Sequence, residues 1–308
     1  MISTKRAIIV GLLGLLAAVS TLSAREFRKA PAAVNPLRSV TADSSPWMPA
    51  GYFSFEHWRY GIRGSDFDLF EVRTSGAATV FQHRGRFGVG FMFASILTSG
   101  PGPDGWQPPT EVEWRMDAVQ FEYGVHLAYR IGSVDLLGEY SRSSFHPFRD
   151  DADENYRINT ADYVRFGIMP PPVLVGPVEL EGFVRTGWLD LFDIWGAPYD
   201  PPRAAWKTTV STWAEVPVSQ RVRFFAHVEP ELLLLRGGGI DVDLYTAAGV
   251  RLPGDFGHLD VFLHYTRIGD VEELSDGAGN LRPFEVNLIG LGVRFAAQPQ
   301  RAAPVVLR

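Results

Sequence analysis

Two polar side chains, Ser144 and His146, stand two positions apart, a spacing that could support nucleophilic catalysis. Positions i and i+2 of an extended chain point to the same face, so the imidazole could act as the base that activates the hydroxyl. Asp150 or Asp151 would then orient the imidazole. This interpretation predicts a hydrolase; the alternative is a polar strand end without catalysis.

The same spacing also argues against catalysis. Neighbours i and i+2 on a strand have Cα atoms about 6.6 Å apart, whereas a base and its nucleophile need a contact of about 2.6–3.2 Å. Pro147 follows His146 directly and restricts its backbone. We therefore rank an enzyme that uses Ser144 and His146 below a protein without catalytic activity.

A larger set of charged and imidazole side chains stands at alternate positions of several segments. If alternate positions face an interior, these charges must be paired or in contact with water. The set predicts either ion pairs that plug the interior or a polar passage biased toward cations. The sequence does not place its histidines at one height, and we expect neither a metal site nor a cofactor. The set comprises Glu122, His126, Arg130, Glu139, Arg165, Glu181, Arg185, Arg223, His227, Glu229, Asp241, Asp243, Arg251, Asp260 and His264.

The segment 119–130 illustrates the pattern that positions these side chains. Its odd positions carry apolar or aromatic residues, and its even positions carry charged, amide or small residues. Successive side chains of a strand point to opposite faces, so one face is apolar and the other polar. Similar runs recur, and they are long enough to cross a hydrocarbon layer, which takes about 9–11 tilted residues. An apolar outside and a polar inside are typical of a transmembrane β-barrel.

The connections between these runs alternate in length. Short ones lie near 84–86, 131–133, 217–220 and 253–257, and long ones cover 98–116, 147–157, 190–204 and 269–283. Outer-membrane barrels have short periplasmic turns and long external loops, and bacterial single-chain barrels have an even number of strands. We predict an all-β fold, an antiparallel transmembrane up-and-down β-barrel of about 12 strands.

The first residues predict export. Lys5 and Arg6 precede an apolar run, and small residues end at Ala24, which is the layout of a cleaved secretory signal peptide. The expected location is therefore the bacterial outer membrane. The predicted divisions are a signal peptide over 1–24, an extended periplasmic leader over 25–50, a transmembrane barrel over 51–296 and a tail over 297–308.

The composition narrows the possible partners. The chain has no cysteine, which excludes disulfides and thiol catalysis. The net charge of -6 does not favour nucleic acid. The expected partners are outer-membrane lipid, lipopolysaccharide and, during biogenesis, the barrel-assembly machinery. The composition sets no oligomeric state.

Two stretches resemble known outer-membrane proteins. Asn287-Leu-Ile-Gly-Leu-Gly-Val-Arg-Phe295 looks like the C-terminal assembly signal of such barrels. The body of the chain resembles an uncharacterised family of Gram-negative outer-membrane proteins in Asn35-Pro-Leu-Arg38, Tyr140-Ser-Arg-Ser-Ser-Phe-His-Pro-Phe-Arg-Asp-Asp151 and Ile289-Gly-Leu-Gly292. The resemblance implies a barrel in the outer membrane and brings no activity.

Three functions follow from these observations. The leading prediction is a narrow channel or binding barrel for small polar or cationic solutes. The second is a lipid or lipopolysaccharide hydrolase that uses Ser144, His146 and Asp150. The third is a structural or surface-interaction barrel with a plugged lumen.

Overall fold

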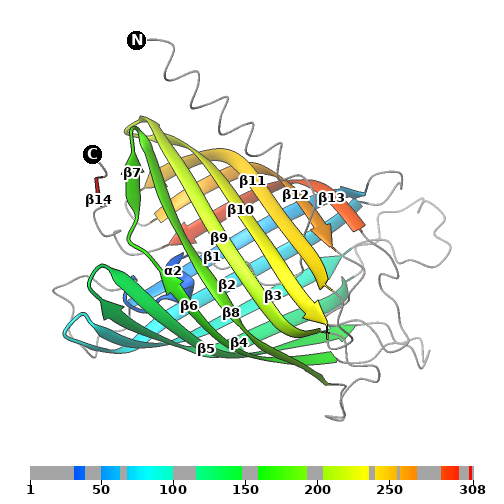
Figure 1. Ribbon diagram of the computed structural model, residues 1–308. Helices are drawn as coiled ribbons and strands as arrows, with labels where there is room; N and C mark the ends of the chain where they lie inside the picture. The colour runs from blue at the N-terminus through cyan, green and yellow to red at the C-terminus, as the bar shows by residue number, and fades with distance from the viewer. Residues whose placement is uncertain are drawn as a thin grey trace.

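Twelve long antiparallel strands form the body of the molecule (Figure 1). The computed structural model describes residues 31–38, 50–62, 68–99, 116–147, 159–192, 204–235, 240–254, 257–268, 286–297 and 305–306. The long strands are β1 (Ala50–Ile62), β2 (Asp68–His83), β3 (Phe87–Ser99), β4 (Met116–Ile131), β5 (Val134–Pro147), β6 (Asn159–Met169), β8 (Val178–Phe192), β9 (Ala204–Ser219), β10 (Val222–Leu235), β11 (Ile240–Gly254), β12 (Gly257–Ile268) and β13 (Val286–Ala297). Two short strands, β7 (Val173–Val175) and β14 (Val305–Val306), and one helical turn, α2 (Pro31–Val34), complete the described elements.

The strands form a closed ring because the first long strand pairs with the last. Each long strand is antiparallel to the next one along the chain, and β6 pairs directly with β8. The final pairing joins β1 to β13, from Phe53 opposite Ala297 to Ile62 opposite Leu288. A closed ring leaves no open sheet edge, which a strand in lipid requires. The predicted antiparallel up-and-down barrel of twelve strands is confirmed.

The two faces of the ring differ in polarity, as the alternation predicts. On β4, Tyr123 and Tyr129 point outward and are 51% and 49% exposed, whereas Glu122 and His126 point inward and are 1% and 2% exposed. Leu127 on the same strand and side chains from other strands extend this outward apolar surface, among them Phe91, Phe93, Tyr140, Phe166, Leu263 and Ile289. Such an apolar belt around a polar interior matches the lipid-facing surface of transmembrane barrels.

Short turns join the strands at one end of the barrel, called the short-turn end below. The turns after β2 and β4 use Gly85 and Gly132, whose φ angles of 63° and 60° favour glycine. Strand β7 pairs with the start of β8 at this end, and β14 adds to β7 in parallel. The predicted long connections at the opposite end lie mostly outside the described residues.

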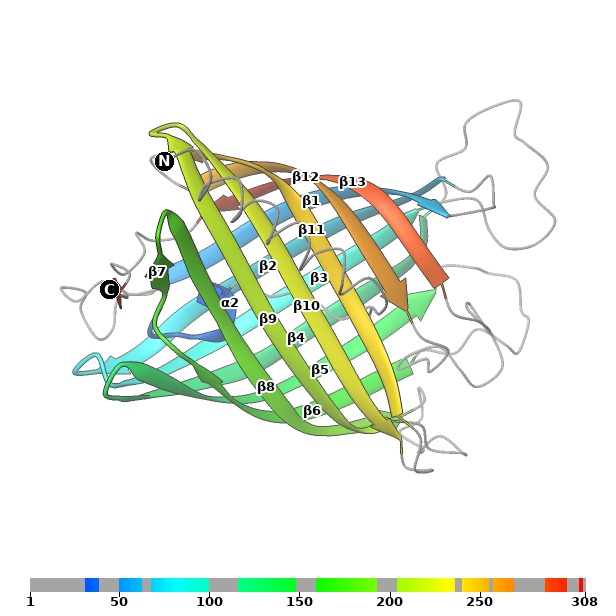
Figure 2. The ribbon, with the colours of Figure 1, turned by 45° about the horizontal axis from the view of Figure 1, so that its top comes forward.

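The N-terminal residues 31–38, called the inner segment below, lie inside the ring near the short-turn end (Figures 1 and 2). This placement differs from the extended leader predicted for 25–50. Apolar packing holds the segment there: Val34 and Leu37 are 1% and 6% exposed and pack against buried side chains of the inner wall. The predicted signal peptide over 1–24 lies outside the described residues. Within the described part of the chain, no helix has the length and apolar character to cross a membrane.

Candidate functional site

Glu139 on β5 is the centre of one buried ion cluster in the barrel interior. One of its carboxylate oxygens accepts hydrogen bonds from Arg165 Nη2 at 2.5 Å and from Ser141 Oγ at 2.8 Å. The other oxygen accepts from Arg185 Nη1 at 2.6 Å, and Glu122 lies 3.7 Å from Arg165 Nη2. The Arg165 and Arg185 side chains are 1% and 3% exposed, so these charges are paired away from water.

Lys207 on β9 continues this cluster along the inner wall. Its Nζ lies 3.0 Å from Glu231 Oε2, and Thr209 Oγ1 donates to the other Glu231 oxygen at 2.9 Å. Arg165 Cζ and Lys207 Nζ lie over the Tyr163 ring, 4.6 Å and 6.0 Å from the centroid of that ring. Lys207 has no exposed side-chain surface. A fully desolvated lysine requires such a partner, because burial of an unpaired charge is costly.

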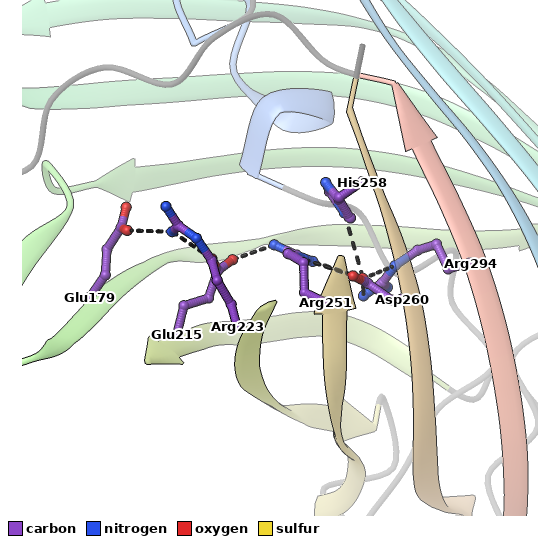
Figure 3. Close-up of polar contacts among 7 residues, drawn as sticks. All are labelled: Glu179, Glu215, Arg223, Arg251, His258, Asp260 and Arg294. Carbon is purple, nitrogen blue, oxygen red and sulfur yellow. Dashed lines mark hydrogen bonds and ion pairs between the residues drawn. The ribbon is translucent and has the colours of Figure 1, made fainter. Parts of the chain in front are cut away.

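A second network crosses the short-turn end (Figure 3), and it is called the arginine–carboxylate chain below. Each of the six strands from β8 to β13 contributes one side chain to it. Its members are Glu179, Arg223, Glu215, Arg251, Asp260 and Arg294. Each arginine except the last lies between two carboxylates, so the positive and negative groups alternate along the inner wall.

Asp260 on β12 holds the end of this chain together. Arg251 donates to both of its oxygens at 2.8 Å, and Arg294 donates twice to one oxygen at 3.0 and 2.7 Å. His258 Nε2 lies 3.5 Å from the same carboxylate. Asp260 has no exposed side-chain surface. One carboxylate therefore joins guanidinium groups from β11 and β13 across their common neighbour β12.

Aromatic rings lie beneath these two arginines. The guanidinium of Arg294 is 4.9 Å from the Trp213 ring centroid and 5.2 Å from that of Phe262. The Arg251 guanidinium is 5.2 Å from the Phe225 ring centroid. Planar guanidinium groups favour such stacking. The rings therefore place apolar surface directly against the charged groups of the chain.

Of the three predicted luminal histidines, His126 contacts the inner segment, whereas His227 and His264 both lie beside the Tyr245 ring. His126 Nδ1 lies 3.1 Å from the backbone oxygen of Val34 in the inner segment. His227 Nε2 lies 2.9 Å from Ser211 Oγ, and the His264 ring lies 6.0 Å from that of Tyr245. In the part of the chain that the structure describes, no group of three or more His, Asp or Glu side chains could hold a metal ion.

The other predicted lumen-lining residues take positions on the inner wall. The buried ones are Glu122, Glu139, Arg165, Arg185, Glu229, Asp243, Arg251 and Asp260, and Arg130, Glu181 and Arg223 are half-buried. The Asp241 side chain lies outside the described residues. The structure brings Glu139 together with Arg165 and Arg185, a combination of three strands that alternation alone does not reveal.

Ser144 lies on the outer face, opposite Phe121 on β4 and Thr160 on β6. It is half-buried, and the His146 side chain and Asp150 lie outside the described residues. Nearby on the same face, Arg142 and Asp162 form a two-pronged ion pair with both contacts at 2.6 Å. The described part of this region is a polar patch near the end of the barrel opposite the short turns.

Asn35 and Arg38 of the inner segment, and His258 and Arg294 of the wall, were not predicted from the sequence to face the lumen. Arg294 stands at an inward position between Val293 and Phe295, so the alternation of β13 was the signal that could have found it. His258 likewise alternates with an exposed residue, Leu259. Asn35 and Arg38 have no periodic neighbours, and no sequence signal places them in the lumen.

Comparisons with known proteins give structural neighbours. No family model matches the chain, and no curated protein does; the resemblance to an uncharacterised family stays a prediction. The β domain of the Bordetella autotransporter Brka is 11% identical, with a TM-score of 0.46 over 82% of this chain and 99% of that one. The Salmonella typhi outer membrane phospholipase is 12% identical, with a TM-score of 0.45 over 85% of this chain and 95% of that one. The translocator domain of the autotransporter NalP from Neisseria meningitidis is 11% identical, with a TM-score of 0.37 over 80% of this chain and 86% of that one. By its closed strand ring and its apolar belt, the chain has the architecture of an outer-membrane β-barrel.

Proposed function

We propose that the protein is an outer-membrane barrel that is closed at rest and is not an open diffusion pore. One observation carries this proposal: most of the charged side chains on the described inner wall are buried, and only a few, such as Arg130 and Arg223, are half-buried. Lys207 and Asp260 are 0% exposed, and Arg165 is 1% exposed. A water-filled passage would leave the charges that line it in contact with solvent, as in wide porins. The third sequence-based alternative, a plugged lumen, is therefore favoured over an open cationic passage.

The balance of charge supports the same choice. The Glu139 carboxylate accepts from two guanidinium groups, and the arginine–carboxylate chain alternates in sign from one contact to the next. A passage biased toward cations would instead present carboxylates that remain available to a solute. In the described interior, arginine side chains already donate hydrogen bonds to the carboxylates of Glu139 and Asp260.

The location and partners belong to the same proposal. The outward belt of Phe93, Phe166 and Leu263 is suited to lipid, and the short-turn end is expected to face the periplasm. Export by a signal peptide over 1–24, contact with lipid and lipopolysaccharide, and insertion by the barrel-assembly machinery complete the proposal.

A gated passage for small polar solutes is the second candidate. One observation favours it: the inner segment is held in the lumen by side-chain contacts and is not a strand of the ring. Its departure would leave the ring of strands intact. Lipid hydrolysis at Ser144 has no comparable support, because its proposed partners lie outside the described residues.

Planar-bilayer recording of the purified full-length protein tests the closed state. Folding is first verified by heat-modifiable gel mobility, so that a silent sample is a folded one. We expect no steady conductance from the wild type, because paired charges and aromatic rings occupy the described interior. A steady ohmic conductance in the folded wild type would overturn the proposal and return the open channel to first place.

A further inference from the structure

The side chain of Asn35 joins the inner segment to the wall through hydrogen bonds. Its Nδ2 donates to Asp135 Oδ2 at 2.8 Å and to Met169 Sδ at 3.4 Å. Its Oδ1 accepts from the backbone N–H of Leu37 at 2.9 Å. Asn35 is 0% exposed. The carboxamide thus fixes the turn of the segment and connects it to β5 and β6.

The wall also contacts the backbone carbonyls of the segment. Thr79 Oγ1 on β2 donates to the carbonyl oxygen of Pro36 at 2.7 Å, and His126 Nδ1 on β4 lies 3.1 Å from that of Val34. In the reverse direction, Arg38 Nη2 donates to the carbonyl oxygen of Pro170 after β6 at 2.9 Å. Contacts with the main chain from several strands are typical of a peptide in a binding groove.

Inward-facing glycines on β3 make the space that the segment occupies. A Cβ added at Gly88 would lie 3.0 Å from Leu37 Cδ2, and one at Gly90 would lie 3.2 Å from Pro36 Cβ. Both distances are tighter than ordinary van der Waals contact. The absence of side chains here therefore allows Pro36 and Leu37 to approach the wall closely.

An apolar pocket completes the groove in an otherwise charged lumen. Leu37 and Val34 belong to one buried cluster with wall residues from four strands. Those residues are Ala128, Leu137, Met169 and Phe183. Beside the pocket, Asp135 has no exposed surface and forms ion pairs with Arg38 at 3.3 Å and Arg130 at 2.6 Å. The groove thus offers a carboxylate and an apolar pocket side by side.

We propose that the inner segment is a detachable plug, a peptide bound in cis to a groove that recognises the order Asn-Pro-Leu-Arg. Asp135 binds the asparagine and the arginine, the glycines of β3 accommodate the proline, and the apolar pocket takes the leucine. The segment contributes no strand to the ring, so it can leave without breaking strand pairing. The inference rests on the proposed closed barrel and names one element that closes it.

Peptide binding tests the groove directly. In the full-length chain, residues 35–38 are replaced by Gly-Ser-Gly-Ser, and a fluorescent synthetic peptide with the sequence of residues 31–38 is added to the folded protein. We expect the replaced barrel to bind the peptide and the wild type not to, because its groove is filled. A peptide with alanine at position 35 should bind about tenfold more weakly, equivalent to about 1.4 kcal/mol. Equal binding to both proteins, or to neither, would overturn the inference.

A reversible cross-link tests whether the segment controls the lumen. A Cβ at Gly88 would lie 3.4 Å from Leu37 Cγ, the atom whose place a cysteine sulfur would take, so cysteines at the two positions come within reach of a disulfide. The chain has no cysteine, so Gly88→Cys with Leu37→Cys gives a single pair. We expect the oxidised variant to be silent in planar bilayers and the reduced one to open, with single-cysteine variants unaffected by oxidant.

The two proposals fail in different ways. Steady conductance of the wild type would overturn the proposal of a closed barrel. The peptide-binding test would then decide separately whether the inner segment is a detachable plug. A folded Gly-Ser-Gly-Ser variant that neither conducts nor binds the peptide would overturn the plug and leave the closed barrel standing. A reduced cysteine pair that is as silent as the oxidised one would also count against the plug.

Discussion

The two halves of the short-turn end are filled in different ways. On the side of β2 to β6, the wall carries Gly88, Gly90 and Ala128, and the inner segment fills the space they leave. On the side of β8 to β13, the arginine–carboxylate chain and its aromatic rings fill the lumen from the wall itself. Wall side chains cannot depart from their strands, whereas the inner segment can. Large inward side chains thus fill the β8 to β13 side, called the fixed half below. Small inward residues leave the β2 to β6 side to the inner segment, and this side is called the removable half.

Loss of Asp260 should have the largest effect, on the fixed half. In Asp260→Ala, Arg251 and Arg294 lose the buried carboxylate that they share. Breaking a buried ion pair in this way costs about 3–5 kcal/mol. We expect a lower urea midpoint of unfolding, measured by loss of heat-modifiable mobility, without faster release of the inner segment. An unchanged midpoint would show that the chain does not stabilise this half.

Loss of the Asn35 carboxamide should affect the removable half alone. Asn35→Ala removes a buried hydrogen bond to the Asp135 carboxylate, which is worth about 1.5–3 kcal/mol. In a Leu37→Cys background, we expect maleimide labelling of the cysteine to accelerate about tenfold or more. The urea midpoint of the ring should not move. A midpoint shift with no change in labelling would mean that the segment is an integral part of the barrel core.

Gly88→Ala should weaken the docking of the segment more gently. The new Cβ would meet the flexible end of Leu37 at 3.0 Å, and overpacking of this kind costs about 1 kcal/mol at the low end of its range. We expect binding of the 31–38 peptide to a barrel with a replaced segment to weaken about fivefold. Gly138→Ala is the matched control, because its Cβ would make an ordinary 3.6 Å contact with Leu127. Equal effects of the two changes would remove the role given to Gly88.

Arg142→Ala should have the smallest effect and should spare both halves. Its ion pair with Asp162 lies on the outer face, where the two side chains are 41% and 21% exposed. Exposed pairs contribute about 0–1 kcal/mol. We expect the urea midpoint and the cysteine labelling rate to stay near their wild-type values. A loss as large as that of Asp260→Ala would show that this outer pair has a role in assembly.

The sequence predicts which face of a strand each side chain takes better than it predicts which side chains meet. The period of two assigns Glu139, Arg165 and Arg185 to one face of their strands, because successive side chains alternate. Their meeting at one carboxylate depends on register and strand tilt, which composition does not encode. The inner segment has no period at all. Its position depends on long-range contacts such as Asn35 with Asp135, a hundred residues apart.

The groove beneath the inner segment has a consequence for the order of assembly. Its walls come from Thr79 on β2, Asp135 on β5 and Met169 on β6, so the groove does not exist until those strands have paired. Yet the segment that fills it precedes all of them in the chain, and synthesis proceeds from the N-terminus. The residues made earliest in the described chain are therefore among the last to find their native contacts.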